Sequence, residues 1–79
     1  MNLITHYTPA DAAAWRKDFD AHAETRMRAG LTLLQLWRDV DGTGMTALFE
    51  VNDRDKAQAW LDAEKQTDGP VEGRFVANA

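Results

Sequence analysis

The sequence predicts an α+β sandwich whose six elements follow the order strand, helix, strand, strand, helix, strand. Three features indicate it: a helical stripe of aromatic and polar side chains within residues 15–30, two extended runs joined by the short turn 41–44, and a Gly-Pro step before the last strand. A chain of 79 residues suits one core, so we expect a single domain over residues 1–79.

We expect a first strand at about residues 2–7, because Ile4 and Tyr7 within it favour extended backbone. Thr8 and Pro9 then predict the start of a helix. A threonine hydroxyl can cap the first turn, and proline fits the first helical position, where no N–H is needed.

The long helix is expected from Pro9 to Ala29, and it carries the most suggestive side chains of the chain. These side chains belong to Trp15, Phe19, His22 and Arg26, which are separated by four, three and four residues. At about 3.6 residues per turn they share one side of the helix, which is aromatic at its start and polar at its end. Gly30 is expected to supply the left-handed turn that follows.

Residues 31–39 and 45–51 are expected to pair as a hairpin through the turn at 41–44. In the first of these runs, odd positions carry Leu31, Leu33, Gln35 and Trp37, and even positions carry Thr32, Leu34, Leu36 and Arg38. Both faces of this strand would therefore be apolar, whereas a strand covered on one side should alternate apolar and polar residues.

Asn52 or Asp53 is expected to cap a second, weaker helix that reaches about Thr67. Gly69-Pro70 should end this helix, because proline cannot continue it and disfavours helical backbone at the residue before. A last strand is then expected over residues 71–77.

This order of elements is that of a ferredoxin-like βαββαβ sandwich, a four-stranded antiparallel sheet with two helices on one face. The other face would leave leucine and tryptophan side chains in water on a scale that soluble monomers seldom show. We therefore expect a homodimer that packs sheet to sheet about a two-fold axis.

Composition argues against several other classes. The formal charge is −4 and the nine basic residues are scattered, so nucleic acid is not an expected partner. No stretch is long and apolar enough for a membrane span and no signal pattern opens the chain, so we expect no membrane partner and a cytoplasmic location. With no cysteine and two histidines, a metal site is not expected.

Four segments carry a resemblance to a known superfamily: Trp15–Gly30, Trp37–Asp39, Leu48–Val51 and Asp55–Ala57. Together they resemble the dimeric α+β barrel proteins, which include antibiotic-biosynthesis monooxygenase-like, polyketide cyclase-like and stress-responsive barrel domains, and in particular the short uncharacterised bacterial members. The resemblance covers most of residues 3–60. It implies a dimer with a ligand pocket between the long helix and the sheet.

The chain departs from this resemblance after its second helix. Relatives carry a longer segment there, which helps to roof the pocket, whereas here only Leu61 to Thr67 precede Gly69-Pro70. The part of the chain that helps to roof the pocket in relatives is therefore abbreviated here.

His22 is the candidate catalytic residue, as a general acid or base, because imidazole ordinarily titrates near neutrality. The alternative is a boundary histidine that a nearby carbonyl or charged neighbour satisfies. Arg26 could clamp a substrate carboxylate, or it could compensate the dipole at the end of the helix.

Trp37 is a candidate pocket wall, because it lies at the end of a strand, where pockets open. The other candidate substrate-binding residues, all on the first strand or the long helix, are His6, Tyr7, Trp15 and Phe19. Each of these candidates has an alternative role. His6 could lie at the dimer interface, and large aromatic side chains more often belong to the hydrophobic core than to a binding site.

Two functions follow from these observations. The chain could bind or convert a small aromatic or polyketide-like molecule, without a cofactor, between the long helix and the sheet. It could instead be a non-catalytic dimeric structural or interaction module, since no paired carboxylates, Ser-His-Asp set or metal-ligand spacing emerges. The sequence does not decide between an enzyme and a protein without chemistry.

Overall fold

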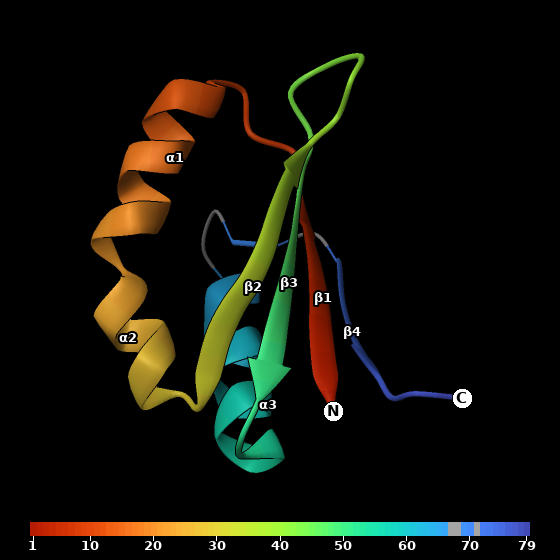
Figure 1. Cartoon of the computed structure of the whole chain (residues 1–79). Coiled ribbons are helices and arrows are strands. Elements are labelled where there is room, and N and C mark those ends of the chain that lie inside the picture. The colour runs from red at the N-terminus through yellow and green to blue at the C-terminus, as the bar shows by residue number, and fades with distance from the viewer. Residues whose placement is uncertain (67–68, 71) are drawn as a thin grey trace.

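The chain forms an antiparallel sheet with helices on one side, as the computed structural model in Figure 1 shows. The structure describes residues 1–66, 69–70 and 72–79. Within them the elements are β1 (Asn2–Tyr7), α1 (Ala12–Ala21), α2 (Ala23–Arg28), β2 (Leu31–Arg38), β3 (Met45–Val51), α3 (Arg54–Lys65) and β4 (Glu72–Val76). The strands lie in the order β2-β3-β1-β4.

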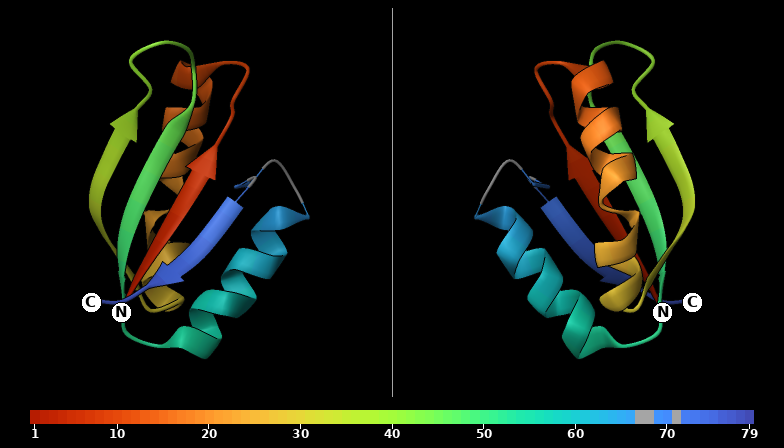
Figure 2. Two further views of the ribbon diagram at one scale, coloured as in Figure 1. Left: turned by 90° about the vertical axis from the view of Figure 1, so that its right-hand side faces the viewer. Right: turned by 90° about the vertical axis from the view of Figure 1, so that its left-hand side faces the viewer.

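The predicted α+β class and four-stranded antiparallel sheet are confirmed. Figure 2 shows the helices in front of the sheet in its right panel and the uncovered face, here called the open face, in its left panel. The predicted first strand matches β1 and the predicted third strand matches β3. The expected end of the second helix at Thr67, and the expected start of the last strand at Val71, lie outside the described residues.

The predicted start of the long helix was wrong. The helix begins at Ala12 and not at Pro9, and its N-cap is Asp11, whose carboxylate accepts a hydrogen bond of 3.1 Å from the N–H of Ala14. A carboxylate at this position also meets the positive end of the helix dipole. The Pro9 carbonyl instead accepts a 2.7 Å hydrogen bond from the hydroxyl of Thr43, which ties this segment to the β2–β3 loop.

The long helix is also interrupted at His22, which the sequence did not predict. The carbonyl of Phe19 accepts the N–H of His22 at 3.2 Å and the guanidinium Nη1 of Arg26 at 2.7 Å. A side chain that bonds to a helix carbonyl in this way breaks the regular ladder and kinks the helix. The break therefore coincides with the inward-turned side chain of Arg26.

A β-bulge changes which side chains of β2 share a face. Its register passes from Leu33 opposite Phe49 to Gln35 opposite Leu48, so Leu34 is skipped. Because a shift of one residue exchanges the two faces of a strand, the alternation reverses at this point. The predicted grouping by odd and even positions across the whole strand was wrong.

Beyond the bulge, Leu36 lies opposite Ala47 on the helix side, and Trp37 lies opposite Thr46 on the open face. Leucines at positions 31, 33 and 36 thus share the helix side. This strand is less apolar on its open face than the uninterrupted alternation predicts.

The core lies between the sheet and the helices. Its buried apolar residues are Leu3, Tyr7, Phe19, Leu31, Met45, Ala47, Phe49, Ala57 and Leu61. Gly73 of β4 allows α3 to approach closely, because a Cβ at this position would come within 2.6 Å of the Leu61 side chain.

Two turn residues behave as the sequence predicts. Asp53 caps α3 and accepts a 3.1 Å hydrogen bond from the N–H of Lys56. Gly30 follows α2 with a φ of 75°, the left-handed conformation that glycine adopts without a steric penalty.

Candidate functional site

A cavity of about 300 Å³, here called the helix-side cavity, opens between the helices and the sheet. Its lining residues come from β1, α1, α2 and α3 and from the segment after α3: Tyr7, Trp15, Asp18, Phe19, His22, Arg26, Trp60, Glu64 and Gly69. The elements that meet here are far apart in the sequence, so the cavity exists only in the folded chain.

Aromatic rings form most of its apolar wall. Trp15 and Phe19 stack with ring centroids 4.7 Å apart and an interplanar angle of 23°. Tyr7 approaches Trp15 at 4.8 Å with its ring tilted by 55°. Trp60 closes the wall from α3 and meets the core through an edge contact with Phe49 at 5.9 Å. Such offset and edge contacts hold rings in fixed positions, so the wall is preorganised.

Arg26 places a nearly buried cation beside this wall. The residue is only 6% exposed, and its guanidinium carbon lies 3.7 Å from the centroid of the Phe19 ring. Burial lowers the pKa of Arg26, while the charges of Tyr7, Asp20 and Glu64 act in the opposite direction. The ring face and the Phe19 carbonyl replace part of the lost hydration, which keeps a guanidinium tolerable at this depth.

Tyr7 contributes a hydroxyl to the same cavity. Its oxygen accepts a 3.1 Å hydrogen bond from the hydroxyl of the fully buried Thr5. Burial raises the pKa of Tyr7, against the Thr5 hydrogen bond and the charge of Arg26, and the charge of Glu64 adds to the rise. The phenol therefore stays protonated at neutral pH and can donate its own hydrogen.

His22 lies at the junction of α1 and α2, with its side chain exposed. Its Nδ1 is 2.8 Å from the Asp18 carbonyl oxygen and 3.6 Å from the Asp18 carboxylate. Because a carbonyl can only accept, Nδ1 must carry the hydrogen in the neutral ring, which leaves the lone pair on Nε2. The imidazole is thus held in the tautomer that can accept a proton at Nε2.

The structure brings together five of the seven residues that the sequence singled out: Tyr7, Trp15, Phe19, His22 and Arg26 all line the helix-side cavity. His6 and Trp37 do not share it. His6 lies opposite Thr46 and Trp37 is the next open-face residue along this row, so both are on the other side of the sheet.

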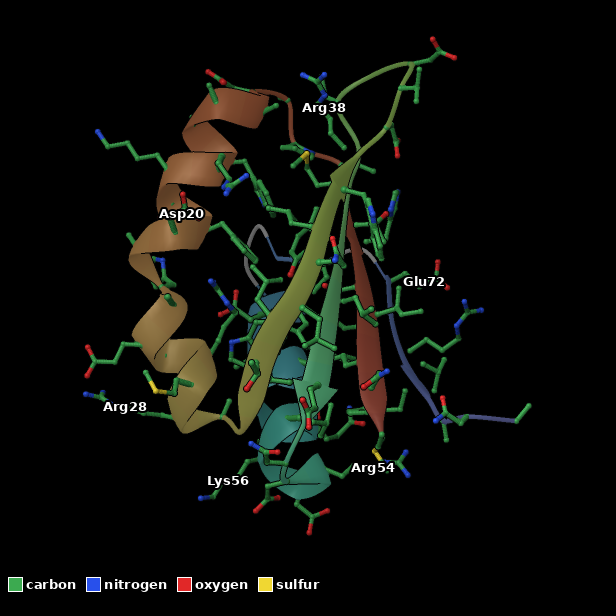
Figure 3. The ribbon with its side chains drawn as sticks, viewed as in Figure 1. Asp20, Arg28, Arg38, Arg54, Lys56 and Glu72 are labelled. Atoms are coloured by element: carbon green, nitrogen blue, oxygen red, sulfur yellow. The ribbon has the colours of Figure 1, made fainter. Side chains whose placement is uncertain are left out.

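On the open face, His6 lines a second depression of about 310 Å³, together with Ile4, Thr46, Glu72 and Arg74. The imidazole Nδ1 is 3.1 Å from the Thr46 hydroxyl. Figure 3 shows the labelled side chain of Glu72 on the side of the sheet away from α1, as its pairing opposite His6 requires.

Four lining residues were not predicted as parts of a site, and one of them is Gly69, which was expected only to end the second helix. Trp60 was assigned to the core, and Asp18 and Glu64 were not proposed as site residues. A usable signal existed, because Asp18 and His22 are four residues apart on one helix, as are Trp60 and Glu64 on another. The four-residue spacing does not, however, show that α1 and α3 face one another across a cavity.

The described part of the chain holds no group of three histidine, cysteine or acidic side chains arranged to bind a metal ion. Among the residues that the structure covers, no helix is long and apolar enough to cross a membrane.

Comparison with known proteins gives a family but no individual relative. No curated protein and no solved structure matches the chain. Residues 1–63, out of 79, match the model of a family described as a domain of unknown function, DUF3303. The match spans β1 to most of α3 and so includes the elements that supply every lining residue except Glu64 and Gly69. The chain therefore belongs to the DUF3303 family.

Proposed function

We propose that this protein binds a small aromatic molecule in the helix-side cavity, without a cofactor, and that His22 serves there as an acid or base. The observation that carries the proposal is the convergence of stacked aromatic rings with a buried guanidinium, a phenol and an imidazole on one cavity of about 300 Å³. Ligand sites in proteins are typically concave and apolar, with a few fixed polar groups.

The geometry of the wall favours a flat ligand. The Trp15 and Phe19 rings are stacked with each other, and Tyr7 and Trp60 add further ring surface. An aromatic molecule between these groups would gain ring contacts in addition to the apolar area it removes from water.

A matched pair of tryptophan variants tests this proposal. Binding of naphthol, followed by ligand-detected NMR, should weaken at least about tenfold in Trp60→Leu, which corresponds to a loss of about 1.4 kcal/mol. Trp37→Leu, on the open face, should leave the affinity unchanged. Equal effects of the two variants, or no binding by the original chain, would count against a site in this cavity.

We also propose that two copies pair through the open face, in the manner of the dimeric α+β barrel superfamily, and that the chain has the ferredoxin-like arrangement of that superfamily. The strand order β2-β3-β1-β4 with all helices on one side supports this arrangement. Trp37, which is 48% exposed, and the half-buried Ile4 and Leu48 give the open face an apolar middle.

Charge supports pairing between copies as well. The open face carries both signs, since Glu50, Glu72 and Arg74 alternate with the apolar residues on β3 and β4. A two-fold axis can set acidic groups of one copy against the arginine of the other.

Sedimentation velocity tests the dimer. Leu48→Arg should produce monomers, whereas Met27→Arg, which adds the same charge at an exposed apolar residue of α2, should not. If the original chain is monomeric at high concentration, the dimer is wrong. A dimer that binds no aromatic probe would instead favour the non-catalytic interaction module.

A further inference from the structure

The first observation concerns the direction in which a proton can move at His22. Its Nδ1 hydrogen is directed to the Asp18 carbonyl at 2.8 Å, so Nε2 is the basic atom. The Asp18 carboxylate lies 3.6 Å from the same nitrogen. A base held in one tautomer by a hydrogen-bonded neighbour is the usual arrangement in acid–base catalysis.

The second observation is a pair of hydrogen-bond donors from two different elements. Arg26 uses Nη1 on the Phe19 carbonyl, and a guanidinium has five N–H groups in all. The Tyr7 oxygen accepts from Thr5, and the phenol carries one hydrogen with which it can act as a donor. Both residues line the helix-side cavity. Two donors held by different elements beside one cavity are suited to an oxygen on which negative charge develops.

The third observation is the charge of the lining. Asp18 and Glu64 are acidic and Arg26 is the one basic side chain among the described lining residues apart from His22. With His22 neutral, the formal charge of this lining is −1, from one positive and two negative groups. An anionic aromatic ligand would meet repulsion there, whereas a neutral one would not.

Together these observations assign a reaction class and rest on the aromatic site proposed above. We infer that the helix-side cavity interconverts a neutral benzylic ketone, whose aromatic ring is attached to the carbon beside the carbonyl, and its enol by proton transfer at that carbon.

In this step His22 Nε2 removes a proton from the carbon beside the carbonyl. The C–H bond breaks, an N–H bond forms, and the electron pair moves onto the carbonyl oxygen to give an enolate. Arg26 and Tyr7 donate to this oxygen while it is negative. The imidazolium then returns its proton, to oxygen for the enol or to carbon for the ketone, so no oxidant, reductant or cofactor is consumed.

The test uses β-tetralone, a neutral aryl-fused ketone with acidic benzylic protons beside its carbonyl. Proton NMR in D₂O follows the exchange of these protons for deuterium, and ligand-detected NMR measures binding in the same samples. The original chain should accelerate exchange over buffer. His22→Gln, at an exposed position that should not disturb folding, should slow the catalysed exchange by about 100-fold or more.

Tyr7→Phe keeps the ring and removes only the donor, so it tests the oxyanion role separately. We expect β-tetralone still to bind while catalysed exchange falls by about 100-fold. Lys17→Gln, an exposed change on the same helix that does not line the cavity, should exchange at the original rate.

The outcomes separate the two proposals. If β-tetralone binds but exchanges no faster than in buffer, the reaction class is overturned and the aromatic binding site stands. If naphthol binds and β-tetralone does not, the ketone class is overturned. If neither probe binds, the proposed function itself fails.

Discussion

The two faces of one sheet have different characters, although the same strands build both. On β1 the helix-side residues Leu3, Thr5 and Tyr7 are buried, while the alternate residues are half-buried. The helix side holds stacked aromatic rings and a nearly buried arginine, and the open face mixes apolar side chains with charges of both signs. Stability and the candidate site therefore depend on one face, and the other face is available for a second role.

The largest expected effect is a core truncation on β3. Phe49 is fully buried at 0% exposure, so Phe49→Ala should lower the free energy of unfolding by about 3–5 kcal/mol. A domain of this size has about that much stability in total, so the variant should be largely unfolded. Urea unfolding followed by circular dichroism measures this.

Leu48 is the matched control, because it is the next residue on the same strand and points to the open face. At low protein concentration Leu48→Ala should cost about 1 kcal/mol, as for a half-exposed side chain. Equal losses for the two variants would contradict the division of the sheet into a core face and an open face.

A smaller effect is expected where α3 packs on β4. Gly73→Ala places a methyl group against the buried Leu61 and should cost about 1–3 kcal/mol. Arg74→Ala, on the opposite face of β4, should change stability by less than about 0.5 kcal/mol. In a Leu61→Ala background the added methyl should cost less. A cost that is unchanged in the double variant would show that the clash is elsewhere.

The smallest effect is a pH dependence confined to the helix side. Burial raises the pKa of Tyr7 in the folded chain above its ordinary value of about 10. The folded chain then holds this proton more tightly, so the associated stability is present below about pH 10 and is lost as the pH rises through the folded pKa.

Urea midpoints measured between about pH 9 and 11 should therefore fall less steeply in Tyr7→Phe than in the original chain. Tyr7 is the single tyrosine of the sequence, so phenolate absorbance reports its titration directly. Ionisation at or below the ordinary pKa would refute the burial argument.

Local sequence patterns predicted most of the strands and helices. The features that they did not predict depend on contacts between residues that are distant in the sequence. The strands at 2–7 and 45–51 follow from extended-favouring residues bounded by turns, and Gly30 follows from helix termination. The bulge at Leu34 depends on how β2 pairs with β3, which periodicity alone does not show. The break at His22 coincides with a hydrogen bond from the Arg26 side chain to the carbonyl of Phe19, seven residues earlier, which helical periodicity does not predict.

The candidate site shows the same division. The residues on one helical stripe, together with Tyr7 on the preceding strand, were predicted and do share the cavity. Trp60 and Glu64 belong to a helix about 40 residues further along, and only the folded sheet brings that helix opposite α1. Trp37 was expected to form a wall of this site because it lies at the end of a strand, whereas after the bulge it lies opposite Thr46 on the open face.

The bulge at Leu34 also affects the exposed edge of the sheet. β2 is the outermost strand on its side, so a row of its backbone groups is left to meet any extended segment nearby. An incoming segment in register with residues before Leu34 is out of register with those after it. This irregularity should discourage open-ended strand addition and fibril growth from that border, which a straight eight-residue strand would invite.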